Sequence, residues 1–319
     1  MHDVLNRLGE IGIVPVVKIE KPSDAAALGR ALIAGDLPVV EITFRTAAAE
    51  ESIRILCREV LEILVGAGTV LTTDQVDRAV AAGARFIVSP GFNPKVVDHC
   101  LERGIPVAPG ISSASEIEMG LERGLSVLKF FPAGASGGLE FLKAISAPFS
   151  GVQFMPTGGI DPGNLRDYLS FNRVHAVGGT WIAREAAIAT GSFDEITRLA
   201  REAVQMSLGF ELAHLGINGS GGNEAMAGAE TMARLFSFPV KDGSSSTFAG
   251  AGFEFMKSPF LGSRGHIAIS TLSIARATSW LSRRGVSVRK ETAKEKDGRM
   301  IAVYLDIEVS GFAIHLLQK

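Results

Sequence analysis

The chain has 319 residues, which is enough for two domains or for one large domain. Its formal net charge of −2 gives no reason to expect a nucleic acid or an anionic membrane surface as a partner. The two cysteines, Cys57 and Cys100, have neither metal-binding nor redox-motif spacing. Neither a signal peptide nor a long apolar span is evident, so we expect a cytoplasmic protein that does not enter a membrane.

The first two thirds of the chain alternate short apolar runs with helical patterns. We predict strands at residues 13–19, 39–43, 64–70, 86–89, 106–109, 127–131, 152–156 and 175–182. Helix-start signals precede 25–34, 75–82 and 116–123, and glycines stand where helices should end, at Gly35, Gly83, Gly104 and Gly124. Strands alternating with helices indicate an α/β fold with a parallel sheet, here a (β/α)8 TIM barrel. An open doubly wound sheet is the alternative, although the first strand lacks the glycine fingerprint of such folds.

A helix at 194–208 ends this region, and the pattern changes after Gly209. We predict a strand at 214–218, a helix at 224–236 and an extended segment at 253–256. A similar series follows, with a strand at 265–269, a helix at 274–284 and strands at 286–291, 301–307 and 312–317. The two series indicate the βαβββ-like halves of a smaller α+β domain. We therefore predict one domain at 1–211 and a second at 212–319.

Lys129 is the most informative residue of the first domain. On a strand, Val127, Lys129 and Phe131 share one face. A charged ammonium is costly to bury between apolar neighbours, whereas a neutral amine can attack a ketone and form a Schiff base. The alternative is a lysine at a strand end whose stem is buried while its amine reaches water.

Glu41 and Arg45 form a set with Lys129, because active sites in such barrels lie at the C-terminal ends of the strands. Alternation puts both on one face of the second strand, with Glu41 deep in the barrel and Arg45 at its mouth. An amine forms an imine with a 2-keto acid, a carboxylate shuttles protons, and a guanidinium binds the substrate carboxylate with two hydrogen bonds. The alternative is that Glu41 only pairs with Arg45 and stabilises the mouth.

Glycine pairs follow the last two predicted strands of the barrel, at Gly158-Gly159 and Gly178-Gly179. Glycines permit close backbone approach, and N–H groups near a helix start favour an anion. Phosphate sites in barrels commonly form after strands seven and eight. The two turns together predict a phosphate site.

Residues 1–210 resemble the class I 2-keto-3-deoxy-6-phosphogluconate (KDPG) and 4-hydroxy-2-oxoglutarate (KHG) aldolases. The resemblance rests on 40–46, 65–71, 89–91, 129–133, 156–160 and 177–181, which keep the family's order. It implies Lys129 as the Schiff-base lysine and Glu41 as the general acid/base, with no cofactor. It further implies substrate contacts: carboxylate contacts at Arg45 and Thr69, the pocket wall at Pro90 and Phe131, and the phosphate end at Thr157, Gly158, Gly159, Gly178, Gly179 and Thr180.

The expected activity is cleavage of KDPG to pyruvate and glyceraldehyde 3-phosphate, of KHG to pyruvate and glyoxylate, or both. The partner is thus a small-molecule 2-keto acid, expected to be phosphorylated, and the resemblance also implies a homotrimer. A non-catalytic barrel that binds a phosphate ligand, with a regulatory or assembly C-terminal domain, is the alternative. Two positions depart from the family: Thr180 is often serine there, and Lys18 on the first strand is either a rim cation or a rival amine.

Residues 212–319 resemble the vicinal-oxygen-chelate superfold of the glyoxalase type. The cue is a histidine in the first strand of each half, His214 and His266, together with a closing strand that carries His315. In metal-dependent members the ligands come from such positions, which implies a divalent metal at these three histidines, with Glu254 as a further ligand. The glutamate that is common on the last strand is absent, so a non-catalytic binding or oligomerisation module is the alternative.

Overall fold

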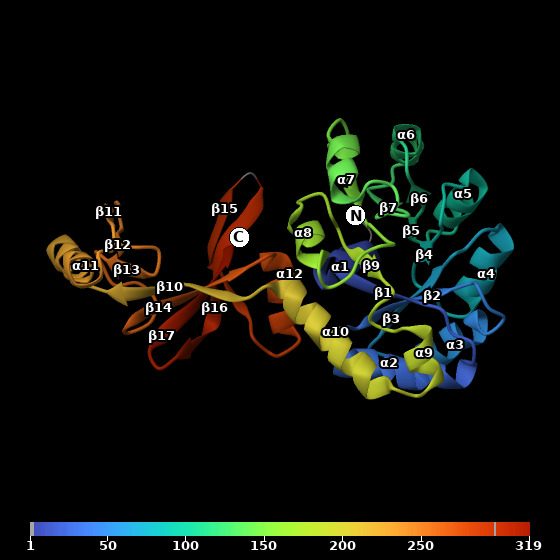
Figure 1. The fold of residues 1–319 in the computed structure, drawn as a ribbon, viewed down its shortest axis with the longest axis horizontal. Helices are drawn as coiled ribbons and strands as arrows, with labels where there is room; N and C mark the ends of the chain where they lie inside the picture. Colours follow the sequence, from blue (N-terminus) through green and yellow to red (C-terminus); the bar gives the residue numbers. More distant parts are fainter. Residues whose placement is uncertain (1–2, 297) are drawn as a thin grey trace. The chain divides into compact units, whose positions relative to one another are not determined.

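The computed structural model describes residues 3–296 and 298–319 and contains two compact units (Figure 1). The first unit ends at Ser207 and the second is Leu208–Lys319. The division falls slightly before the predicted boundary, because the Leu208 carbonyl accepts hydrogen bonds from the Leu272 N–H and from Thr271 Oγ1 of the second unit. Among the described residues, no helix is both long and apolar enough to cross a membrane.

Each of the eight regions predicted from the sequence contains a strand of the first unit, and one further short strand lies just after the fifth region. The strands are β1 Ile13–Val17, β2 Val39–Thr43, β3 Leu64–Gly68, β4 Ile87–Val88, β5 Val107–Ala108, β6 Gly110–Ile111, β7 Val127–Phe130, β8 Gln153–Phe154 and β9 Val177–Gly179. Seven of the eight predicted strands were too long, because the apolar runs continue past the paired residues into the turns. The fifth predicted strand ends at Pro109, which has no N–H group to donate to a neighbouring strand, and the unpredicted β6 begins directly after it.

The strands form two parallel pieces. One sheet has the order β5-β4-β3-β2-β1-β9, and the other has the order β6-β7-β8. β5 and β6 are separated by one residue, and a parallel bridge joins Thr157, after β8, to Gly178 of β9. The unit is therefore an α/β, barrel-like domain, and the open doubly wound sheet is not observed.

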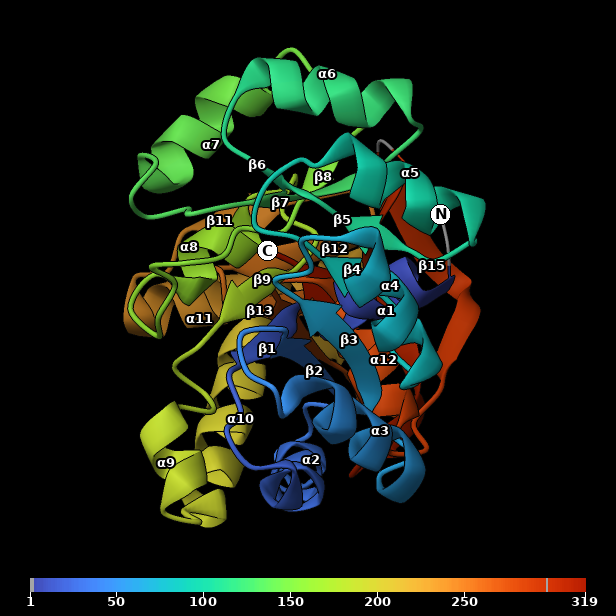
Figure 2. The same cartoon turned by 90° about the vertical axis from the view of Figure 1, so that its right-hand side faces the viewer.

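Most helices of this unit lie around the outside of these strands (Figure 2). The helices are α1 Asp3–Ile11, a 3-10 turn Pro22–Asp24, α2 Ala25–Ala34, α3 Ala49–Glu59, α4 Thr73–Ala81, α5 Pro94–Glu102, α6 Ala114–Glu122, α7 Gly138–Ser146, α8 Leu165–Ser170, α9 Glu185–Ala189 and α10 Phe193–Leu208. Side chains cap several of them: Thr72 accepts the Gln75 N–H, and Ser113 and Glu116 form a capping box. These caps fix where each helix leaves a strand end, and so they position the turns at that end.

In the described residues 208–296 and 298–319, the second unit is an eight-stranded sheet with two helices that lie wholly within it. Its strands are β10 Glu211–Asn218, β11 Val240–Asp242, β12 Ser246–Ala249, β13 Phe253–Met256, β14 Gly265–Thr271, β15 Val288–Lys296, β16 Arg299–Val309 and β17 Phe312–Gln318, and its helices are α11 Gly222–Phe236 and α12 Ile274–Ser282. β11 and β12 were not predicted, because they are short and lie in a glycine- and serine-rich stretch.

The sheet order, β11-β12-β13-β10-β14-β17-β16-β15, shows two equivalent βαβββ halves. In each half the first strand runs parallel to the last, as β10 does to β13 and β14 to β17. The two first strands, β10 and β14, pair antiparallel and join the halves. The predicted repeat of the α+β domain is confirmed at this level.

Candidate active site

Lys129 and Glu41 meet inside the first unit, although β7 and β2 are not neighbouring strands. Lys129 Nζ lies 3.4 Å from Glu41 Oε1, and the two residues are 4% and 0% exposed. The Lys129 amine also lies 5.2 Å from the centre of the Phe131 ring. Because Lys129 is buried beside a carboxylate, it is not a strand-end lysine that reaches water.

Glu41 has one free acceptor. Its Oε2 atom is buried and has no hydrogen-bond partner among residues 3–296 and 298–319. Its ion pair is with Lys129, and Arg45, two residues beyond β2, is exposed. The interpretation in which Glu41 merely pairs with Arg45 is therefore wrong. A buried carboxylate with an unused acceptor next to an amine is suited to moving a proton.

The remaining predicted substrate residues lie at the C-terminal ends of the strands. Thr69 directly follows β3 with φ 54°, a left-handed conformation that is rare for a β-branched residue and is typical of functional sites. Pro90 lines a pocket of about 280 Å³ together with residues 70–71, 89 and 91–93. Arg45 follows the same end of its own strand, so all three residues lie at strand ends, although neither Arg45 nor Thr69 lines the Pro90 pocket.

The two glycine turns are linked to one another. Gly158 and Gly159 have φ 89° and 80°, which favours glycine, and Thr157 bridges to Gly178. A Cβ on Gly178 would lie 2.3 Å from Thr157 Oγ1, so only glycine permits this approach. Thr180, which follows Gly179, is exposed. The predicted phosphate end is thus assembled from adjoining segments.

Lys18 is held by two carboxylates, Glu20 at 2.7 Å and Glu185 at 3.0 Å. Hydrogen bonds, first to Glu20 and then to Glu185, raise the pKa of the Lys18 amine. A higher pKa keeps this amine protonated and therefore non-nucleophilic, which favours the rim cation over the rival amine.

The second unit brings together four side chains from the first and last strands of its two halves: His214 of β10, Glu254 of β13, His266 of β14 and His315 of β17. One nitrogen from each histidine lies within 4.8 Å of the others. The Nε2 atoms of His214 and His266 are 3.1 Å apart, and they lie 3.1 Å and 3.0 Å from Glu254 Oε2. We refer to these four residues as the histidine cluster.

Electrostatics in this cluster keep the His315 imidazole neutral and the Glu254 carboxylate ionised. Burial, followed by the neighbouring His266 and His214, lowers the pKa of His315 to about 3. Burial alone would raise the pKa of Glu254, but hydrogen bonds from the His214 and His266 side chains outweigh it and hold the pKa well below its usual range. Neutral imidazole and ionised carboxylate are the forms that bind metals.

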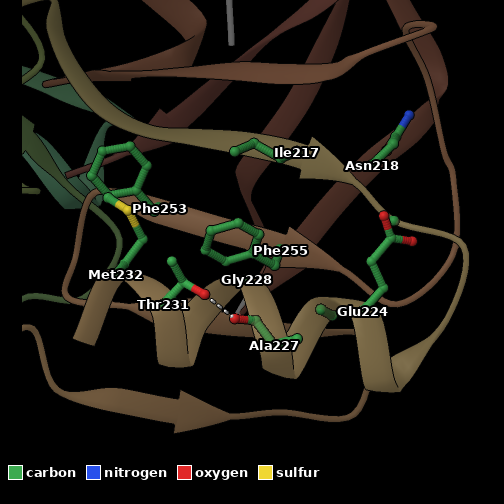
Figure 3. A pocket seen from close by; sticks show the side chains of 11 residues that line it. Ile217, Asn218, Glu224, Ala227, Gly228, Thr231, Met232, Phe253 and Phe255 are labelled. Carbon is green, nitrogen blue, oxygen red and sulfur yellow. Dashed lines mark hydrogen bonds between the residues drawn. The ribbon is translucent and has the colours of Figure 1, made fainter. Parts of the chain in front are cut away.

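The other face of this sheet carries a separate pocket of about 490 Å³, lined by α11, β10 and β13 (Figure 3). Its walls include Ile217, Phe253 and Phe255, with Glu224 at one end. Strand alternation places Ile217 and His214 on opposite faces, so this pocket does not belong to the histidine cluster.

Comparison with known proteins supports the assignment of the first unit. The family model described as KDPG and KHG aldolase matches residues 4–199. The 2-dehydro-3-deoxy-phosphogluconate aldolase of Treponema pallidum is 47% identical over 206 residues, covering 65% of this chain and 98% of that protein. The KHG/KDPG aldolase of Escherichia coli is 46% identical over 193 residues, covering 60% of this chain and 91% of that protein.

A solved structure agrees with these matches. The KDPG aldolase of Legionella pneumophila, with pyruvate captured at low pH as a covalent carbinolamine intermediate, is 40% identical. The two structures superimpose with a TM-score of 0.61, and the match covers 62% of this chain and 97% of the Legionella chain. With the family model spanning most of the first unit and a buried lysine beside a carboxylate within it, the chain belongs to the KDPG and KHG aldolase family.

Proposed function

We propose that the first unit is a Schiff-base aldolase that cleaves KDPG, KHG or both to pyruvate and an aldehyde. The buried Lys129–Glu41 pair is the observation that carries this proposal. A barrel that only binds a phosphate ligand has no need of an imine-forming amine with a carboxylate 3.4 Å away.

The mechanism follows from the positions of these groups. Lys129 Nζ attacks the C2 ketone, and loss of water gives a protonated imine that accepts electrons. Glu41, directly or through a water, removes the C4 hydroxyl proton as the C3–C4 bond breaks and the aldehyde leaves. The enamine is protonated at C3, and water then hydrolyses the imine to release pyruvate and the free amine.

The surrounding residues hold the substrate. The exposed guanidinium of Arg45 and the hydroxyl of Thr69 bind the C1 carboxylate, while Pro90 and Phe131 form the pocket wall. The N–H groups of Gly159 and Gly179, with the Thr180 hydroxyl, receive the phosphate; Thr157, Gly158 and Gly178 shape these turns. No cofactor is required by these steps.

Borohydride trapping with pyruvate tests the proposal. The parental protein and a Lys18→Ala control should gain a reduced pyruvyl adduct, whereas Lys129→Ala and Lys129→Arg should not, because arginine stays protonated. Labelling of the Lys129→Ala protein would assign the nucleophile elsewhere. A parental protein that binds the substrate but is never labelled would favour the non-catalytic barrel.

The barrel is proposed to be a closed (β/α)8 TIM barrel that assembles as a homotrimer. Closure is supported by the single residue, Pro109, between β5 and β6 and by the Thr157–Gly178 bridge. The homotrimer follows from the family resemblance. Light scattering after size-exclusion chromatography tests it, since a mass other than three chains would contradict it.

We further propose that the second unit is a vicinal-oxygen-chelate, glyoxalase-like domain whose histidine cluster holds one divalent metal. Ligand nitrogens at about 2.0–2.1 Å from one ion stand about 3.0–3.5 Å apart, which fits the 3.1 Å between His214 and His266. His315 Nε2 is buried and has no hydrogen-bond partner among the described residues, so it is free to coordinate. Three imidazoles and one carboxylate suit zinc, nickel or iron, and such an ion supplies Lewis acidity.

Metal analysis and thermal unfolding test this second proposal. Purified protein should carry about one divalent metal per chain, and His266→Ala should lose it while imine trapping at Lys129 is unchanged. His99→Ala is the matched control, because His99 pairs with Asp77 on the surface of the first unit. If zinc, nickel and manganese each fail to raise the unfolding temperature of metal-free protein, the domain is better described as a binding or assembly module.

A further inference from the structure

Glu41 lies against a glycine that the sequence reasoning did not select. Gly68 is the last residue of β3, which pairs with β2. A Cβ built on Gly68 would lie 2.0 Å from Glu41 Oε1 and 2.7 Å from its Cδ and Cγ. The φ of Gly68 is not in the left-handed region, so an alanine would fit the backbone. A glycine is therefore needed at position 68 because any larger side chain would overlap the Glu41 side chain, and not because of the backbone conformation.

A second glycine of the same strand serves a different neighbour. A Cβ on Gly66 would lie 2.2 Å from the Phe86 ring, whose residue is 1% exposed and belongs to the core. Gly66 and Gly68 share one face of β3, because side chains alternate along a strand. One glycine thus makes room for a core ring, and the other makes room for a carboxylate that ends beside Lys129.

We propose that Gly68 is a positioning residue that sets the location of the Glu41 carboxylate relative to Lys129. This inference rests on the proposed role of Glu41 as the acid/base. Tolerable contacts begin near 3.0 Å, so a methyl group at position 68 must move Oε1 by on the order of 1 Å. The end of the glutamate side chain yields more readily than a buried aromatic ring, so the substitution displaces the carboxylate and spares the core.

The test compares Gly68→Ala with Gly66→Ala in the full chain. Gly68→Ala should lower kcat by on the order of 100-fold, since a misplacement of about 1 Å costs that much. Its pyruvate imine should still be trapped by borohydride, and its unfolding temperature should stay near the parental value. Gly66→Ala should instead lower the unfolding temperature, because it presses on Phe86. Parental kcat in Gly68→Ala, or loss of imine trapping, would overturn the proposal.

A double-mutant cycle separates positioning from a general defect. In the Glu41→Gln background Gly68→Ala should cost little further activity, because the carboxylate that it displaces is already gone. Equal losses in both backgrounds would overturn the proposal. If Gly68→Ala does not fold, Glu41→Ala/Gly68→Ala decides: folding of the double variant supports the steric relation, and its failure to fold refutes it. A parental protein without imine trapping would instead refute the aldolase proposal itself.

Discussion

Glu41→Gln separates imine formation from bond cleavage. The carboxylate is 0% exposed, and the amine 3.4 Å from Oε1 is its ionic partner. Loss of a positioned acid/base costs about 10²–10⁴-fold in rate, which is about 3–5 kcal/mol of transition-state free energy. Because Glu41 is fully enclosed, we expect the upper half of this range. Imine formation with pyruvate should persist, since its nucleophile is Lys129.

The assay couples pyruvate release to lactate dehydrogenase for turnover and uses borohydride trapping for the imine. The variant keeps the shape of Glu41, but its amide N–H₂ becomes a buried donor, which costs about 1–3 kcal/mol of stability if unpaired. Thermal unfolding should therefore be measured beside activity. Glu185→Gln is the matched control, because Glu185 also pairs with a lysine, Lys18, but at an exposed position. Turnover of Glu41→Gln within tenfold (roughly 1.4 kcal/mol) of the parent would remove Glu41 from the mechanism.

Three further predictions concern single side chains. Arg45→Ala should raise KM for the keto acid about 10–100-fold, the worth of hydrogen bonds to a charged group, while Arg45→Lys should recover only part of it; an unchanged KM would contradict the carboxylate contact. Thr180→Ala should lower kcat/KM for KDPG about 2–10-fold relative to KHG, which lacks phosphate, and equal losses for both would contradict a phosphate contact. Burial raises the pKa of the Cys100 thiol to about 12, from an ordinary 9.0, so the unfolded chain releases this proton first as pH rises. The free energy of unfolding should therefore fall between pH 9.0 and about 12, by less in Cys100→Ala, and iodoacetamide should spare Cys100 in the folded protein at pH 9.0.

The order of strands could be predicted from the sequence because each apolar run is bounded by turn and cap residues. The strand at 39–43 and the helix at 25–34 were predicted with the observed bounds. The residues at which the other strands end could not be predicted, because they depend on which backbone N–H groups find a partner on the neighbouring strand. The proximity of Lys129 and Glu41 could be predicted only once a parallel barrel was inferred. The regular alternation of strand and helix patterns along the sequence indicates that barrel.

Other features depend on three-dimensional packing that periodicity does not encode. The role of Gly68 appears only when the Glu41 side chain is seen to lie over it. β11 and β12 lack a strong apolar pattern, and their place comes from pairing across the sheet, β12 with β13 and β11 with β12. The repeat in the second unit predicted His214 and His266 on the equivalent first strands and His315 on the closing strand, but not that their nitrogens lie within 4.8 Å of one another.

The division of the second unit into two joined halves has a consequence for how its chains can associate. Each half supplies two members of the histidine cluster. The halves meet through the antiparallel pair β10 and β14, and the segment 257–264 carries the chain from the end of β13, in the first half, to β14, in the second. If that segment opened, two chains that exchanged second halves would recreate every strand pairing and both clusters. Domain swapping would thus preserve the cluster, whereas separation of the halves would destroy it, so the length of this short connection governs which assemblies are accessible.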